Sequence, residues 1–138
     1  MKIEERLIKY AQYNTASNPD AADDKFPSSD KQWEFARLLQ KEMQEIGLQN
    51  IVLDDNCYLF GTIPSNVDKD FIPAIGFIAH MDVSSEVDSL NVNPRIIHFD
   101  GQDILLNKEK DIWLRPDDFP VLNNYIGNLK SLLLGIPK

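Results

Sequence analysis

The chain has 138 residues, and its 14 Lys and Arg against 22 Asp and Glu give a net charge of −8. This length suits one domain or part of a larger one, and the 43% of hydrophobic residues argues against disorder. The acidic balance disfavours nucleic acid and anionic membranes as partners, because both bind basic surfaces. Cys57 is the single cysteine, which excludes an intrachain disulfide and suits a reducing cytoplasm.

No targeting or membrane segment is expected. The start of the chain lacks the apolar segment of a signal peptide. The longest apolar runs, 74–79 and 132–136, are far shorter than the roughly 18 residues of a membrane-spanning helix. The sequence therefore predicts a cytoplasmic protein with no membrane partner.

The first third of the chain predicts two helices joined by a loop. Apolar residues recur at helical spacing over 3–13, and turn-forming residues follow over 14–29. Ser29 is expected to cap the second helix, with Gln32 completing a capping box, and Gly47 is expected to end it. One apolar stripe runs along this helix, formed by Trp33, Ala36, Leu39, Met43 and Ile46.

Shorter periodicities after the second helix predict strands. Residues 51–53 and 57–63 flank a turn at 54–56, and 71–79 are almost wholly apolar, which is typical of a strand buried on both faces. Helices followed by strands indicate an α/β fold. The remaining pattern predicts a strand at 95–99, a turn at 100–101, a return strand at 104–106 and a loop at 117–128.

A histidine and an aspartate follow the apolar run. His80 and Asp82 come directly after the expected strand, and ligands of α/β proteins gather where such strands end. Residues i and i+2 of a strand share a face, so the carboxylate can orient an imidazole that binds a metal. On these two residues alone, a partly buried histidine bonded to a nearby acid is the better explanation, because the His-x-Asp pattern often occurs by chance.

The segments around this pair resemble the peptidase T family, the tripeptide aminopeptidases among the di-zinc metallopeptidases. The resemblance covers about residues 3–128. It is carried by 75–82 (IGFIAHMD), 13–17 (YNTAS), 32–39 (QWEFARLL), 45–48 (EIGL), 91–97 (NVNPRII), 101–104 (GQDI) and 118–120 (DFP).

The resemblance implies a fold, a metal and a substrate. The fold is a partial three-layer sandwich, with helices packed on a mixed sheet, from the N-terminal part of a zinc-peptidase catalytic domain. Two zinc ions and tripeptide substrates are implied for the complete enzyme. His80 is implied as a zinc ligand, and Asp82, counted with the catalytic residues, as the acid that orients it.

The last residues depart from the family pattern. We expect peptidase sequence over 1–128 and a divergent, truncated tail over 129–138. Other metal ligands and the glutamate base have no counterpart, and a catalytic zinc needs about three protein ligands. The chain alone is therefore expected to be inactive, unless a second polypeptide complements it. The alternative is a non-enzymatic α/β remnant without a metal site that self-associates through an unpaired sheet edge.

Two other features of the sequence could form sites. His98 and Asp100 repeat the His-x-Asp pattern and could form an improvised site with His80, but an ordinary strand end explains them better. Cys57 has no nearby basic cluster, so a small buried thiol is expected rather than a nucleophile.

Overall fold

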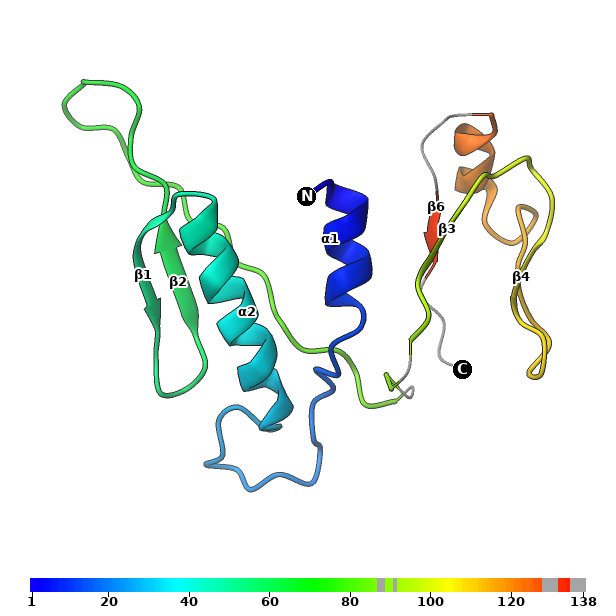
Figure 1. Cartoon of the computed structure of the whole chain (residues 1–138), viewed down its shortest axis with the longest axis horizontal. Helices are drawn as coiled ribbons and strands as arrows, with labels where there is room; N and C mark the ends of the chain where they lie inside the picture. The colour runs from blue at the N-terminus through cyan, green and yellow to red at the C-terminus, as the bar shows by residue number, and fades with distance from the viewer. Residues whose placement is uncertain (87–88, 91, 128–131, 135–138) are drawn as a thin grey trace. The chain divides into compact units, whose positions relative to one another are not determined.

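The computed structural model describes residues 1–86, 89–90, 92–127 and, for the backbone, 132–134. The chain forms two compact units, one comprising 15–87 and the other comprising 1–14 with 88–138. Figure 1 traces their helices and strands. Each unit is described by itself.

The unit of residues 15–87 is built on a helix and a hairpin. Helix α2 (Lys31–Glu45) packs against strands β1 (Gln49–Leu53) and β2 (Leu59–Thr62), which pair antiparallel (Figure 1). The turn between the strands is held by Asp54, whose Oδ1 accepts the backbone N–H groups of Asn56 and Tyr58 at 3.0 and 2.8 Å. Both predicted strands and the predicted turn are confirmed.

The C-terminal end of α2 follows the prediction. Gly47 adopts a φ of +88°, and its N–H donates to the carbonyl of Gln44 at 3.1 Å. The N–H of Leu48 donates to the carbonyl of Met43 at 3.0 Å. This is the Schellman arrangement, which satisfies helix carbonyls that have no partner within the helix.

The N-terminal end of α2 corrects the prediction. The cap is Asp30 rather than Ser29, and no side chain caps the helix. Gln32 does not close a capping box. Its buried side chain instead donates to the backbone carbonyl of Thr15 at 3.2 Å. The capping pattern was wrong because a contact 17 residues away takes the Gln32 amide.

The apolar stripe of α2 is only partly buried. Ala36 is fully covered, but Ile46 is 58% exposed. Trp33, Leu39 and Met43 are intermediate. Phe35, which the predicted stripe omits, is buried.

The apolar run at 71–79 does not form the expected buried strand. None of these residues belongs to a strand or helix, and all are exposed. Phe71 and Ile78 are 100% exposed, and Phe77 is 94% exposed. A strand buried on both faces needs neighbours at both edges, and the described residues place no strand beside this run.

The second unit begins with α1 (Ile3–Tyr10), which confirms the first predicted helix over a shorter range. None of its residues is buried, and Ile3 is 83% exposed. The other elements of the unit are β3 (Arg95–Ile97), β4 (Ile104–Asn107), β5 (Ile112–Leu114), the short 3₁₀ helix η1 (Pro120–Tyr125) and β6 (Leu132–Leu134).

The core of the second unit is small. Phe99, Ile104 and Leu122 are buried against one another, with Ile97, Leu106 and Leu114 packed around them. Phe99 is 2% exposed. The carbonyl of Phe99 accepts the N–H of Gly127 at 3.3 Å, which ties the end of η1 to the segment after β3.

Strand pairing in this unit differs from the prediction. We expected 104–106 to return along 95–99, but β4 pairs antiparallel with β5 and β3 pairs antiparallel with β6. The expected loop at 117–128 contains η1. The backbone bends at residues 101–102, where Gly101 has a φ of +94°, which agrees with the turn predicted at 100–101. Periodicity finds strands but does not choose their partners.

The helices and strands agree with the α/β class in its coarse form. Among the described residues the strands form three two-stranded antiparallel sheets, and the expected mixed sheet with covering helices is not assembled. The predicted boundary at residue 128 and most of the 129–138 tail lie outside the described residues.

Candidate metal-ligand site

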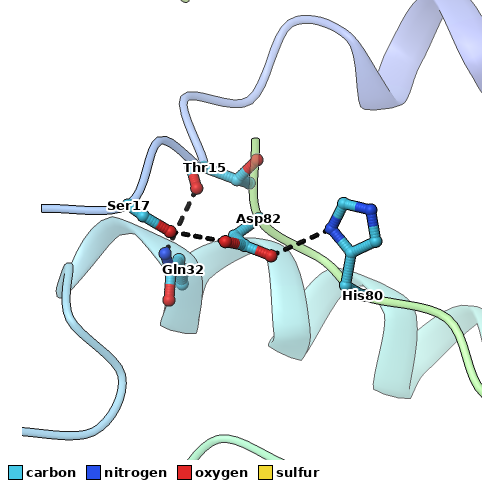
Figure 2. Close-up of polar contacts among 5 residues, drawn as sticks. All are labelled: Thr15, Ser17, Gln32, His80 and Asp82. Carbon is cyan, nitrogen blue, oxygen red and sulfur yellow. Dashed lines mark hydrogen bonds and ion pairs between the residues drawn. The ribbon is translucent and has the colours of Figure 1, made fainter. Parts of the chain in front are cut away.

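His80 and Asp82 contact each other as their spacing predicts. The Nδ1 atom of His80 lies 2.9 Å from Oδ1 of Asp82. The His80 side chain is 82% exposed and the Asp82 side chain 43% exposed. Figure 2 shows the second ring nitrogen of His80 pointing away from Asp82. If Nδ1 carries the proton, the lone pair of Nε2 is presented to solvent, as a metal-binding imidazole requires.

Ser17 contacts the other oxygen of the same carboxylate. Its hydroxyl donates to Oδ2 of Asp82 at 2.5 Å, across 65 positions of sequence (Figure 2). This hydrogen bond is the main reason that the pKa of Asp82 lies below its ordinary value, with desolvation acting against it and the His80 contact acting with it. The carboxylate is therefore charged at neutral pH and accepts from both sides.

Backbone pairing holds the two segments together. Ala16 and Val83 form a parallel bridge, in which the N–H of Ser17 donates to Val83 at 3.1 Å and the N–H of Val83 donates to Thr15 at 3.3 Å. The carbonyl of Thr15 also accepts the side-chain amide of Gln32, and Thr15 is only 4% exposed. The first turn of α2 thus fixes the loop that carries Ser17.

The arrangement fits one zinc-ligand position. An exposed imidazole with its other nitrogen on a carboxylate matches the way that proteins hold zinc-binding histidines. A catalytic zinc needs about three protein ligands. Over the ranges that the structure describes, no three His, Cys, Asp or Glu side chains gather in a metal-binding group. His98 and Asp100 are both exposed and belong to the other compact unit, so the improvised site with His80 stays a prediction.

Sequence reasoning missed the residues behind the pair. Thr15 and Ser17 belong to a segment that resembles the family, and the pattern around Gln32 predicts a helix cap, so neither pattern indicates a contact with Asp82. Periodicity carries no signal for a contact between positions 17 and 82. The bridge at Val83 brings these segments together, and an isolated bridge has no sequence pattern of its own.

Comparison with known proteins gives consistent matches, although no family model matches the chain. The chain is 48% identical over 125 residues to a protein of Geobacillus kaustophilus, a match that covers 90% of this chain and 30% of that protein. It is 46% identical over 125 residues to one of Alkaliphilus oremlandii, which covers 89% and 30%. A third, from Halothermothrix orenii, is 47% identical over 127 residues, which covers 91% and 30%.

All three relatives are named peptidase T, and the resemblance of this chain to peptidase T is confirmed. The chain spans about 30% of the length of these relatives. Among the described residues, no helix is long and apolar enough to cross a membrane.

Proposed function

We propose that this chain supplies part of the metal site of a zinc aminopeptidase that releases the N-terminal residue of tripeptides. The observation that carries the proposal is the 2.9 Å contact between His80 Nδ1 and Asp82 Oδ1, within a chain related to peptidase T. In this role His80 is a zinc ligand through Nε2, and Asp82 orients its ring.

The residues present do only part of what such an enzyme needs. A zinc ion with about three protein ligands and an open position polarises a carbonyl group or activates a water molecule. From its described residues this chain contributes one ligand and the acid that orients it. We therefore propose that the chain has no tripeptidase activity alone, and that the remaining ligands of the two implied zinc ions come from sequence that corresponds to the rest of the relatives.

A chimeric enzyme tests the proposal. The 125 aligned residues of the Geobacillus kaustophilus peptidase T are replaced by those of this chain, and tripeptide hydrolysis is measured with added zinc. We expect turnover by the chimera, loss of at least about a hundredfold in its His80→Ala variant, and little change in His98→Ala, which is the matched histidine control. A folded chimera whose turnover survives His80→Ala would contradict the proposal.

Tripeptide hydrolysis by the chain alone shows whether it is active by itself or only together with the additional sequence. We expect no zinc-dependent turnover without the additional sequence, and turnover abolished by His80→Ala would show this to be wrong. Co-expression with the remaining part of the relative tests whether the ligands can be supplied by a separate polypeptide.

One observation favours a second, non-enzymatic role. The exposed apolar run at 71–79 presents four large side chains to solvent at 79% exposure or more, namely Phe71, Ile75, Phe77 and Ile78. Exposed apolar patches of this kind mark association surfaces. A chain that self-associates through this run, with no metal bound, is the alternative to the enzymatic proposal.

A further inference from the structure

We propose that Ser17 is a positioning residue that fixes the tautomer of His80 through Asp82. Its hydroxyl occupies Oδ2 of the carboxylate, so that Oδ1 is left for Nδ1–H of the imidazole. The inference deepens the proposed function and rests on it for the assignment of His80 as a zinc ligand. It adds a residue that touches neither the metal position nor a substrate.

The geometry gives each carboxylate oxygen one partner. The contact from Ser17 Oγ to Oδ2 is 2.5 Å and the contact from His80 Nδ1 to Oδ1 is 2.9 Å (Figure 2). A carboxylate accepts hydrogen bonds and donates none when it is ionised. Because Asp82 cannot donate, the contact is satisfied only when Nδ1 carries a proton, and in the neutral ring Nε2 then keeps its lone pair.

The position of Ser17 is itself fixed. The bridge between Ala16 and Val83 sets the register of the two segments. Ser17 and Asp82 are each next in sequence to a bridged residue, so the bridge brings them together. The side-chain amide of Gln32 anchors the same loop by donating to the carbonyl of Thr15. Gln32 and Thr15 are both more than nine-tenths buried. The hydroxyl therefore reaches Asp82 from a loop that is attached to α2.

The contribution of Ser17 is to hold the carboxylate in one rotamer. The His80 side chain is 82% exposed, so little packing restrains its ring. Without the Ser17 contact, rotation of the half-exposed Asp82 side chain releases Nδ1, and the imidazole can then exchange to the other neutral tautomer. Residues that orient a metal-binding histidine in this way commonly alter metal affinity when they are mutated.

The test is the tautomer ratio of His80, read by long-range ¹H–¹⁵N correlation in this chain over a pH series, from the spectra in which the ring is neutral. We expect His80 to favour the Nδ1–H tautomer, with His98 as the internal comparison. Ser17→Ala is expected to lower the ratio of Nδ1–H to Nε2–H by about threefold or more. Ser17→Thr keeps a hydroxyl and is expected to restore it.

Matched variants separate positioning from general disruption. Ser28 lies in the same loop, where its hydroxyl accepts the N–H of Asn18 at 3.1 Å, so Ser28→Ala is expected to leave the ratio unchanged. If Ser17→Ala fails to fold, Ser17→Cys replaces it: its thiol is a weaker donor, so the ratio of Nδ1–H to Nε2–H is again expected to fall.

The outcomes distinguish the two proposals. A wild-type His80 that favours Nδ1–H but is unaffected by Ser17→Ala or Ser17→Cys overturns the role of Ser17 and leaves the proposed function in place. A wild-type His80 without preference for Nδ1–H overturns the inference and also the ligand orientation on which the proposed function depends. A ratio that falls equally in Ser28→Ala would overturn the inference as a loop effect.

Discussion

The side-chain amide of Gln32 donates to the backbone carbonyl of Thr15 over 3.2 Å, and both residues are buried. Through this hydrogen bond the first turn of α2 supports the loop that carries Ser17. The carbonyl of Thr15 also accepts the N–H of Val83 at 3.3 Å, so the Gln32 contact is one of two hydrogen bonds to the same buried oxygen.

Replacing Gln32 by Leu should destabilise the unit of residues 15–87 by about 0.5–1.5 kcal/mol, since the buried carbonyl of Thr15 loses one of its two hydrogen bonds. Hydrogen exchange of the α2 amides measures this free energy for that unit alone. Gln44 lies on the same helix but is exposed, so Gln44→Leu should stay within about 0.5 kcal/mol of the wild type. Equal losses in the two variants would show that the hydrogen bond is not the cause.

Gly47 ends α2 in a left-handed conformation, with a φ of +88°. A Cβ atom at this position would meet nothing within 4 Å, so the cost of Gly47→Ala is conformational rather than steric. We predict a loss of about 1–2 kcal/mol in the free energy of unfolding, measured by denaturant titration. An unchanged midpoint would mean that the helix ends differently in solution.

Cys57 should behave as a buried thiol. It is 4% exposed, and burial raises its pKa, with Arg37 acting in the opposite direction and Asp54 with it. We predict slow alkylation by iodoacetamide at pH 7 and rapid alkylation after unfolding in urea. Comparable rates in the two conditions would contradict the buried position, which was predicted from sequence.

The same shift predicts a pH dependence of stability. A pKa raised in the folded state stabilises the fold fully below the unfolded value of about 8.5, and this contribution is lost as the pH rises through the folded pKa. The difference in unfolding free energy between the wild type and Cys57→Ala should therefore fall as the pH rises above about 8.5. A constant difference across this range would show that Cys57 does not titrate differently in the two states.

The exposed run at 71–79 should make the chain self-associate. We expect the partner to be a second copy of the chain, paired antiparallel about Ile75. This register sets Asp70 opposite His80 of the second copy, whereas parallel pairing would set identical residues opposite each other. Sedimentation should show a weight-average mass that rises with concentration.

Two matched variants test this association. Ile63 and Ile75 are both 79% exposed, but only Ile75 lies in the run. Ile75→Lys should abolish the concentration dependence, and Ile63→Lys should preserve it. A monomer at all concentrations, or equal effects of the two lysines, would contradict self-association through residues 71–79.

The elements that the sequence predicted well are those whose causes are local. The end of α2 at Gly47 and the hairpin turn at Asp54 depend on neighbouring residues, and the structure confirms both. The strand expected at 71–79 failed because strand formation there depends on partners at its edges. The local reading of Gln32 failed because a distant carbonyl takes its amide.

The candidate site divides in the same way. The contact between His80 and Asp82 follows from their i, i+2 spacing and could be predicted. The contribution of Ser17 could not, because it depends on a bridge between segments that are far apart in sequence.

The zinc content of the chimera, measured by mass spectrometry after dialysis, tests most directly whether His80 is a metal ligand. We predict that the chimera retains zinc and that His80→Ala lowers its content, while His98→Ala keeps the full amount. Zinc affinity of the Asp82→Asn variant should fall by about tenfold to a hundredfold, because the acid that orients the ligand is weakened. A folded His80→Ala chimera with unchanged zinc content would contradict the assignment of His80.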